Sequence, residues 1–356
     1  MNVCILGSGL TSLTLAKSLI NQGILVDIFS SKNNFIKDVN RTLGISKANL
    51  EFFNNEILNI DQFRWDIKKI EIFSENLSGK KILNFENDNE YLFSMIRNDN
   101  LVNHLRLKLK KEKLCNFKKK LISIDILKEN YDLIFNCDYS NFISKKFFFK
   151  QMKKNYNSLA YISKIKHTKI KNKIAIQIFT KKGPLAFLPM SKTETSVVYS
   201  VKGLEKINLN DLIKKYNPNY EIKDISNPST IKLSSSNLRT YYDKNILAFG
   251  DLLHKIHPLA GQGFNMILRD IKTIINLIKL RKENGLALDS SICIDFEQKT
   301  KNKNYLFSNG IDFIYEFFNL ESKINNDSLS RAVKYFGNNK NVNKIFKKIA
   351  DNGLIY

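Results

Sequence analysis

Apolar residues at the start of the chain are arranged first as a strand and then as a helix. The run Asn2 to Leu6 (NVCIL) is β-type, GSGLTS follows it, and LTLAKSLI then continues as an amphipathic helix. A second β-type run, Ile24 to Ser30 (ILVDIFS), follows at the spacing of a βαβ unit. The pattern predicts a Rossmann-like beginning to the fold.

A second strand-to-helix transition lies late in the chain. Asn245 to Phe249 (NILAF) is typical of a strand, and the glycine-rich stretch GDLLHKIHPLAGQGFN follows from Gly250 to Asn265. Apolar residues then recur at helical spacing, at Phe264, Ile267, Leu268, Ile271, Ile274, Ile275 and Ile278. We therefore expect a helix that begins at this loop, with its N-terminus facing a ligand.

The size and composition of the chain favour more than one domain. Its 356 residues, of which 43% are hydrophobic, exceed what one core usually organises, so we expect two domains or one with a large insertion. The net charge of +23 comes mostly from lysines scattered from Lys17 to Lys348, which does not favour a nucleic-acid partner. A lysine-rich composition explains this charge, and attraction to an anionic membrane is a second explanation.

The cysteines and the apolar runs indicate the cellular compartment of the protein. Cys4, Cys115, Cys137 and Cys293 form no CxxC pair and no cluster with metal-ligand spacing, so we expect reduced, mostly buried thiols and no metal. No apolar run reaches the roughly 18 residues that a membrane-spanning helix needs, and no signal peptide is evident. We expect a cytoplasmic protein, soluble or peripheral on a membrane.

The first glycine turn has the chemistry of a dinucleotide site. Gly7 permits a tight turn, Gly9 lets backbone N–H groups approach a pyrophosphate, and Ser12 holds the third glycine position. Ser30 stands where Asp or Glu would bind the adenosine ribose. Glycine turns between a strand and a helix also occur without a ligand, so this motif predicts the fold and leaves open whether a nucleotide binds.

The stretch from Gly250 to Asn265 resembles the second FAD-binding motif of the flavoprotein aromatic hydroxylases of the para-hydroxybenzoate hydroxylase fold. The resemblance is greatest to the ubiquinone-biosynthesis hydroxylases, whose motif reads approximately GDAAHxxHPxAGQGxN. The matching residues are Gly250, Asp251, His254, His257, Pro258, Ala260, Gly261, Gln262, Gly263 and Asn265. A glycine-rich loop that caps an ordinary helix would explain the glycines but not Asp251, Pro258 and Asn265 together.

The residue types in this motif suit a flavin. Asp251, just past a strand, can accept hydrogen bonds from ribityl hydroxyls, and Gly261 and Gly263 let the backbone approach a flat ring. The N–H groups at the helix start would stabilise the anionic reduced cofactor. The predicted cofactor-binding residues are Gly7, Gly9, Ser12, Ser30, Arg41, Asp138, Gly250, Asp251, Pro258, Gly261, Gln262, Gly263 and Asn265.

Two further stretches agree with the resemblance. Asn40 to Phe53 is similar to the family segment in which an arginine contacts the flavin side of the site, which here is Arg41. Gly183 to Met190 (GPLAFLPM) is similar to a signature of the quinone-pathway branch. We expect strand-end prolines there and a substrate cavity lined by Pro184, Leu185, Phe187 and Pro189. An apolar core strand with proline edges is the alternative.

The sequence departs from the family pattern in the segment that, in the family, contacts both FAD and the nicotinamide donor. In CDYSNFISK (137–145) Asp138 is retained, whereas Tyr139, Phe142 and Lys145 replace the family's glycine, serine and arginine. Leu252 and Leu253 replace two small alanines, which implies local repacking beside the flavin. Ser12 and Ser30 weaken the ADP half of the first motif. The replacements in CDYSNFISK therefore fall in the segment on which reduction by NAD(P)H would depend.

The resemblance implies an α/β fold with a Rossmann-like FAD-binding domain, an inserted α+β substrate domain with a mixed or antiparallel sheet, and C-terminal helices. By residue range, the predicted FAD-binding domain is discontinuous (1–58, 98–148 and 236–320). The predicted substrate domain comprises 59–97 and 149–235, and a helical tail follows at 321–356. Asp295 to Phe318 is similar to the family's late helices.

The function implied by the resemblance is ring hydroxylation of a polyprenyl-phenol or quinone precursor in ubiquinone biosynthesis. FAD would be reduced by NAD(P)H, react with O2 to a flavin hydroperoxide, and transfer one oxygen atom to the ring. His257 and Pro258 are the candidate catalytic residues, although a structural histidine is the other interpretation. The alternatives are a catalytically eroded scaffold of the quinone-synthesis assembly, or another reductase or oxidase on this fold.

A lipid-like phenol implies contact with a membrane or with other enzymes of the quinone pathway. Gly310 to Leu320 is apolar nearly all round, and a basic tail follows from Lys323 to Lys348. Such a helix is usually a core element. Docking of this helix and the tail on a bilayer or on partner enzymes is the alternative hypothesis.

Overall fold

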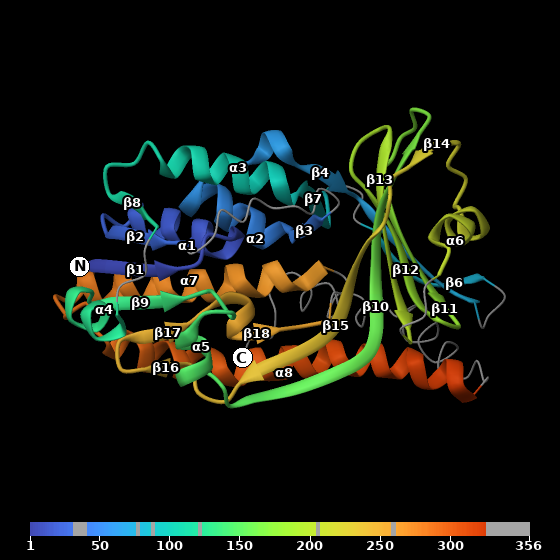
Figure 1. Cartoon of the computed structure of the whole chain (residues 1–356). Helices are drawn as coiled ribbons and strands as arrows, with labels where there is room; N and C mark the ends of the chain where they lie inside the picture. The colour runs from blue at the N-terminus through green and yellow to red at the C-terminus, as the bar shows by residue number, and fades with distance from the viewer. Residues whose placement is uncertain are drawn as a thin grey trace.

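The computed structural model combines two large sheets, a small third sheet and long C-terminal helices (Figure 1). It describes residues 1–30, 41–75, 79–86, 90–119, 123–203, 207–257 and 261–324. This mixed α/β architecture, with parallel and antiparallel sheets followed by helices, confirms the fold class predicted from the sequence.

The first sheet is six-stranded and mostly parallel. Its order is β16 (Tyr242–Asp243), β17 (Ile246–Ala248), β9 (Leu133–Asn136), β1 (Asn2–Leu6), β2 (Leu25–Phe29) and β8 (Cys115–Lys118). Val3 of β1 pairs with Val26 on one side and Leu133 on the other, and only β16 runs antiparallel to its neighbour. The three strands predicted at Asn2, Ile24 and Asn245 are confirmed, and their apolar runs are buried because helices cover the sheet.

Helices pack on this sheet along apolar faces. They include α1 (Leu10–Ile20), α3 (Asn98–Leu109), α4 (Ile124–Asn130), α5 (Phe142–Phe147) and α7 (Gln262–Glu283). Helix α7 buries Phe264, Ile271, Ile275 and Ile278, the spacing that predicted it, and it begins at Gln262. The glycine turn after β1 therefore opens α1, and the late glycine loop opens α7.

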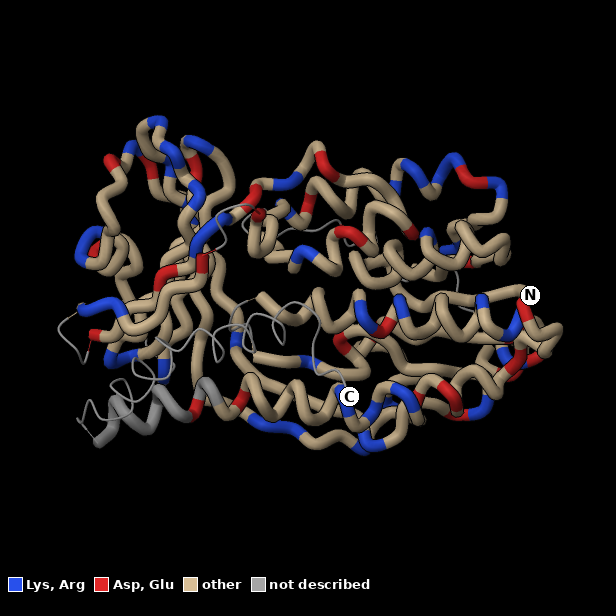
Figure 2. Tube along the Cα trace, turned by 180° about the vertical axis from the view of Figure 1, so that it is seen from behind, with Lys and Arg blue, Asp and Glu red and all other residues tan. Residues whose placement is uncertain are grey.

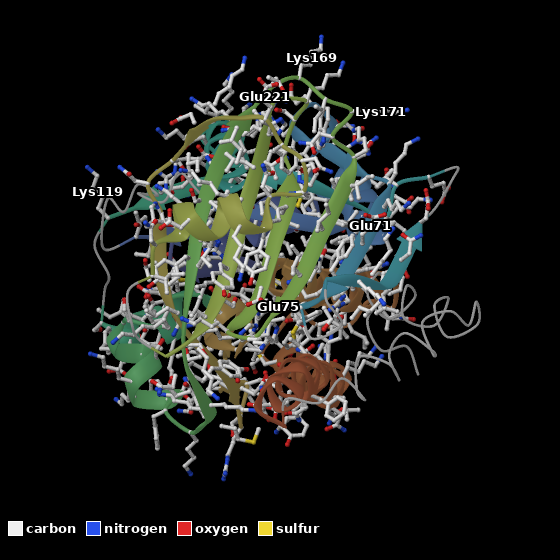
Figure 3. The ribbon with its side chains drawn as sticks, turned by 90° about the vertical axis from the view of Figure 1, so that its right-hand side faces the viewer. Glu71, Glu75, Lys119, Lys169, Lys171 and Glu221 are labelled. Atoms are coloured by element: carbon white, nitrogen blue, oxygen red, sulfur yellow. The ribbon has the colours of Figure 1, made fainter. Side chains whose placement is uncertain are left out.

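The second large sheet is antiparallel except where β11 pairs with β5. Its order is β18 (His254–Lys255), β15 (Ser229–Leu238), β10 (Gln151–His167), β13 (Glu194–Lys202), β12 (Gly183–Pro189), β11 (Ile174–Thr180), β5 (Lys69–Ser74) and β6 (Lys80–Glu86), with β14 (Ile222–Ile225) also paired to β10. Helix α6 (Leu209–Tyr216) lies across its outer face, as the end-on view in Figure 3 shows.

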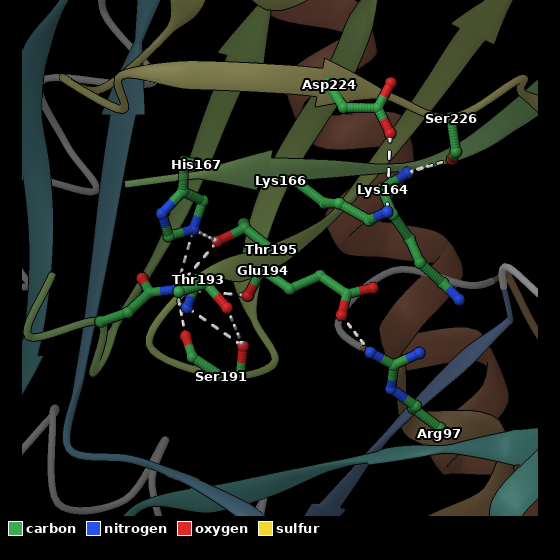
Figure 4. Close-up of polar contacts among 11 residues, drawn as sticks. Arg97, Lys164, Lys166, His167, Ser191, Thr193, Glu194, Thr195, Asp224 and Ser226 are labelled. Atoms are coloured by element: carbon green, nitrogen blue, oxygen red, sulfur yellow. Dashed lines mark hydrogen bonds and ion pairs between the residues drawn. The ribbon is translucent and has the colours of Figure 1, made fainter. Parts of the chain in front are cut away.

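A small third sheet lies between the two large ones. It contains β3 (Thr42–Ser46), β7 (Phe93–Arg97) and β4 (Trp65–Ile67), and α2 (Lys47–Phe52) with its π-helical continuation Phe53–Ile57 follows β3. Arg97 forms an ion pair with Glu194 of β13 (Figure 4), and Thr42 Oγ1 donates to Ser196 Oγ at 3.2 Å. Strand β3 falls in the predicted FAD-binding range and β7 in the predicted substrate range, and the division of the chain into domains stays a prediction.

Helix α8 (Ser291–Ile324) connects the six-stranded sheet to the second large sheet along one side of the molecule (Figure 1). Ser308 Oγ donates to Asn237 Oδ1 of β15 at 3.1 Å, and Tyr156 of β10 donates to Asp312. The family-like late helices predicted from Asp295 to Phe318 are thus one helix. Residues 325–356, which include most of the predicted tail, lie outside the described residues.

The cysteines are free thiols. Cys4 and Cys293 are buried, while Cys115 and Cys137 are half-buried. Burial raises the pKa of the Cys293 thiol to about 12 and raises that of Cys4 as well. Basic and acidic residues are scattered over the molecule and are not gathered on one element (Figure 2). Among the described helices, none combines the length and apolarity needed to cross a bilayer.

A buried polar contact fastens α8 and α7 to the second sheet. His254 Nε2 lies 2.5 Å from Asp270 Oδ2, and both side chains are at most 2% exposed. Asn304 Nδ2 donates to the other carboxylate oxygen of Asp270 at 3.0 Å. Three elements, β18, α7 and α8, therefore share one carboxylate.

Loss of this carboxylate should destabilise the fold strongly. Asp270→Ala leaves His254 and Asn304 buried without their acceptor, so we expect the free energy of unfolding to fall by about 3 kcal/mol. The matched control is Asp224→Ala, which removes an exposed pair with Lys166 and should cost less than about 0.5 kcal/mol. Urea denaturation followed by circular dichroism measures both, and equal losses would contradict the assignment.

Candidate functional site

The early glycine turn has a backbone conformation at Gly7 that favours glycine. Gly7 has φ +112°, and its N–H donates to the Phe29 carbonyl at 2.8 Å. A Cβ at this position would lie 3.1 Å from Ser12 Oγ and 3.6 Å from the Asp138 Cβ. Gly7, Ser12 and Asp138, which the sequence predicted as cofactor contacts, are therefore brought together where β1 and β9 end.

The N-terminus of α1 is open to an anionic group. Gly9 precedes the helix, no side chain among the described residues caps it, and its first turn carries no acidic residue. No described atom lies within 4 Å of the position that a Cβ of Gly9 would occupy. Free N–H groups with open space before them fit the pyrophosphate of a dinucleotide.

Ser30 lies beside this turn, at the carboxyl end of β2. Its hydroxyl is 2.9 Å from the hydroxyl of Ser8. Asp138 instead uses its carboxylate within its own turn, where Oδ1 accepts from the N–H of Ser140 at 2.8 Å and from its hydroxyl at 2.7 Å. Both predicted residues therefore lie near Gly7. Ser30 contacts Ser8 through its hydroxyl, and Asp138 has one carboxylate oxygen, Oδ1, engaged by Ser140.

The late motif meets the early one at Gly250. Gly250 has φ +65°, and a Cβ there would lie 2.7 Å from Thr11 Cγ2 of α1. Asp251 is exposed, and its negative charge reaches Cys137, whose pKa is raised to about 12 mainly by burial. A hydrogen bond with Ser12 lowers the pKa of the same thiol, but by less than burial raises it. Asp251, Cys137 and Ser12 are therefore neighbours at the edge where β1, β9 and β17 end.

The start of α7 holds the second half of the predicted site. Gly261 precedes the helix with φ +63°, and a Cβ there would lie 3.6 Å from the Gly44 nitrogen. Gln262 Oε1 is buried and has no hydrogen-bond partner within the described part of the chain. Gly263 follows, and a Cβ there would lie 4.0 Å from Ile256 Cγ1. An unpartnered buried amide oxygen at a helix N-terminus fits a ligand that carries hydrogen-bond donors, as a flavin pyrimidine ring does.

Asn265 has structural partners in this structure. Its Oδ1 accepts from the Ser46 N–H at 2.9 Å and from Asn49 Nδ2 at 3.1 Å, and its Nδ2 donates to the Gly44 carbonyl at 2.8 Å. The side chain is 1% exposed. Asn265 thus fastens β3 and α2 to α7, so that it shapes the site by holding its walls in place.

Of the two residues predicted to be catalytic, His257 and Pro258, the structure describes His257. His257 is fully buried, its ring stacks edge-on against Tyr156 with centroids 4.9 Å apart, and burial lowers its pKa to about 4. It is therefore neutral at pH 7. Pro258 lies outside the described residues.

Arg41, which the sequence predicted as a cofactor contact, is exposed. Its carbonyl accepts from the Asn98 N–H at 3.2 Å, and this hydrogen bond joins the residue before β3 to the start of α3.

The predicted substrate residues occupy both faces of β12. Pro184 is the second residue of this strand and Pro189 the last, so the prolines stand at the strand ends as expected. Leu185 and Phe187 are fully buried on the side covered by α6. Leu188, on the opposite face by the alternation of a strand, packs with Met95 of β7. A role in substrate binding stays a prediction for all of these residues, and for Leu185 and Phe187 it competes with their place in a core.

Two residues that matter to this geometry were absent from the predicted site. Thr11 packs directly against Gly250, and Gly44 lies against Gly261. Gly44 could have been found, because a lone glycine within the strand-like segment after Arg41 indicates a close backbone approach. Thr11 carries no such signal, since threonine is common in the first turn of a helix.

Comparison of the whole structure with solved structures identifies its fold. p-Nitrophenol 4-monooxygenase PnpA from Pseudomonas putida superposes with a TM-score of 0.79 at 11% identity, over 97% of this chain and 96% of PnpA. HpxO from Klebsiella pneumoniae, solved with FAD and uric acid, superposes with a TM-score of 0.73 at 10% identity, over 99% of this chain and 97% of HpxO. The chain has the fold of the FAD-dependent aromatic monooxygenases.

Sequence comparison narrows the resemblance to one branch. The chain is similar to the 3-demethoxyubiquinol 3-hydroxylase of Escherichia coli, with 28% identity over 153 residues, or 40% of this chain and 39% of that protein. It is also similar to the COQ6 ubiquinone biosynthesis monooxygenase of Schizosaccharomyces pombe, with 19% identity over 56% of this chain and 52% of that protein. The chain thus matches about half or less of the length of these relatives. No family model matches it.

The contact between Gly250 and Thr11 can be tested by a compensating pair. Gly250→Ala adds a methyl group 2.7 Å from Thr11 Cγ2 at a positive φ, so we expect roughly 1–3 kcal/mol of destabilisation. Adding Thr11→Ala relieves the steric part and leaves about 1 kcal/mol of backbone strain. Thermal unfolding of both variants and of Thr11→Ala alone measures the coupling. Strictly additive losses would show that the contact is unimportant.

Burial of His257 predicts a pH dependence of stability. Because its pKa is about 4 in the folded chain and 6.5 in the unfolded chain, only the unfolded chain binds a proton between these values. Stability is therefore lost as the pH falls through this window, by up to about 3 kcal/mol. His257→Phe, which keeps a ring against Tyr156, should flatten this part of the curve. Urea midpoints of both proteins across the window check it, and parallel curves would contradict it.

Proposed function

We propose that this chain is an FAD-dependent monooxygenase that hydroxylates the aromatic ring of a polyprenyl-phenol or quinone precursor in ubiquinone biosynthesis. The observation that carries the proposal is the convergence of the two glycine motifs, in which Gly250 of the late motif lies against Thr11 of the early one. Similarity to a 3-demethoxyubiquinol 3-hydroxylase and to a ubiquinone biosynthesis monooxygenase supports the reaction and the substrate class. The TM-scores support the fold on which it would occur.

FAD would be held by residues from both motifs. The open N-terminus of α1 would receive the pyrophosphate, the Ser30 hydroxyl would face the ribose, and Asp251 would accept from the ribityl chain. The N–H groups at the start of α7 and the buried Gln262 Oε1, which has no partner among the described residues, would bind the pyrimidine end of the flavin ring. The flavin, when bound, would supply the redox chemistry that activates O2.

This chain's own residues would orient the substrate and exclude water. The face of the second sheet that carries Leu188 opposes the small third sheet, and the contacts Arg97–Glu194 and Thr42–Ser196 join the two sheets. We propose that the aromatic ring binds on this face, since the opposite one is filled by α6. His257, neutral and buried against Tyr156, would position the late loop rather than transfer a proton.

The electron donor would be NAD(P)H, and the segment that would serve its binding departs from the family pattern. Tyr139 is 73% exposed where the family has glycine, and the Asp138 carboxylate is already held by Ser140. These observations favour the second candidate function, a flavoprotein scaffold of the quinone-synthesis assembly with little turnover. Contact with a membrane or with other pathway enzymes belongs to either proposal.

The decisive test is the absorption spectrum of the purified chain together with one substitution. Wild type should be yellow, and Asp251→Ala should bind FAD about 10- to 100-fold more weakly because hydrogen bonds to a charged acceptor are lost. Asp211→Ala on α6 removes the same charge away from both motifs and should retain FAD fully. Fluorescence titration of the apoprotein with FAD measures all three.

Turnover then separates the two candidate functions. NAD(P)H oxidation that rises with a prenylated phenol, with formation of a hydroxylated product, supports the monooxygenase. Flavin-bound protein without such stimulation supports the scaffold. Colourless protein that FAD cannot load, or full FAD occupancy in Asp251→Ala, would overturn the assignment of this site.

A further inference from the structure

The segment from Phe142 to Lys154 presents apolar side chains to solvent. Phe142 of α5 is 48% exposed, Phe149 is 62% exposed and Met152 of β10 is 37% exposed. Between them, Ile143 and Phe148 are buried in the main core, so the segment is anchored to the body of the protein. Large exposed aromatic side chains grouped in one short segment indicate a surface that is covered in use.

The same segment is strongly basic. Residues 142–154 (FISKKFFFKQMKK) contain five lysines and no acidic residue. Lys146 lies 5.3 Å from the centre of the Phe147 ring, and Lys150 lies 5.9 Å from the centre of the Phe149 ring. Ammonium groups are thus interleaved with exposed rings, an arrangement in which the apolar parts enter an interface while the charges stay in water.

Helix α8 continues this surface. Tyr305 and Phe313, 43% and 68% exposed, line a hollow of about 390 Å³ together with Met152 and Lys153. The acidic residues of the hollow have protein partners, because Tyr156 donates to Asp312 and Lys154 pairs with Glu316 at 3.2 Å. The hollow therefore adds apolar surface to the segment while its carboxylates are compensated locally.

We infer that this basic aromatic face, formed by Phe142, Lys145, Lys146, Phe149, Lys150, Met152 and Lys153 with Tyr305 and Phe313 of α8, docks on an anionic lipid surface. Lysines near such a surface each contribute on the order of 1 kcal/mol of attraction, and aromatic side chains favour the headgroup region. Helix α5 and the start of β10, which carry the segment, lie at the side of the molecule along which α8 runs (Figure 1). Its binding to lipid does not depend on the proposed reaction.

A second lysine cluster provides a matched control. Lys169, Lys171 and Lys192 are exposed in the loops at one end of the strands of the second sheet, the end at which Figure 3 shows Lys169 and Lys171. Replacing these three lysines changes the net charge by the same amount as replacing three lysines of the basic aromatic face. Any effect of total charge alone would therefore appear equally in both variants.

The experiment is co-flotation of the full chain with vesicles of phosphatidylcholine, with or without phosphatidylglycerol. Wild type should float with the anionic vesicles at low salt and less at high salt. Lys146→Gln/Lys150→Gln/Lys153→Gln should lower the partition coefficient roughly a hundredfold. Lys169→Gln/Lys171→Gln/Lys192→Gln should change it little. Phe149→Ser/Met152→Ser should weaken binding that persists at high salt.

Each outcome of the flotation assay is decisive. Absence of wild-type binding to anionic vesicles, equal losses in the two lysine variants, or unchanged binding in both variants of the face would overturn the proposal. Circular dichroism and the FAD content of each variant are measured alongside, so a folding defect is recognised separately. A chain that floats but does not turn over substrate would refute the proposed reaction and leave the lipid-binding face intact.

Discussion

The approach of the backbone at Gly250 to Thr11 is the constraint on which the candidate site depends. It places the end of β17 against the first turn of α1, with only 2.7 Å available where a Cβ would stand. Parallel strands β1, β9 and β17 end at one edge, so the turns that follow them meet there. A ligand that bridges the two glycine motifs requires this meeting, because the motifs are more than 230 residues apart in the chain.

Asn265 performs a similar task on the other side of the site. Its amide holds Gly44 and Ser46 of β3 against the first turn of α7, and the third sheet is in turn joined to β13 by Arg97 and Glu194. The face of the second sheet that carries Leu188 is thus connected by polar contacts to the helix whose N-terminus would hold the flavin. The same few side chains, Asn265, Arg97 and Glu194, therefore connect the start of α7 to the third sheet and the third sheet to β13.

The sequence predicted the elements well wherever a periodic apolar run was bounded by glycine. The strands at Asn2 and Ile24 and the helix after Gly261 are confirmed almost to the residue. Side-chain orientation was harder to predict. Leu185 and Phe187 face the core under α6, and this depends on which face of β12 another helix covers, which no local pattern in that strand reveals. Asn265 matched a motif, but its three protein partners come from a segment more than 200 residues earlier.

The buried thiols have a practical meaning. Reagents that alkylate or oxidise cysteine attack the thiolate, and burial keeps Cys4 and Cys293 protonated far above neutral pH. In the folded chain these two sulfur atoms are therefore nearly inert, and they become reactive only when the surrounding strands and helices separate. The rate at which such a reagent labels them reports how often an individual molecule opens.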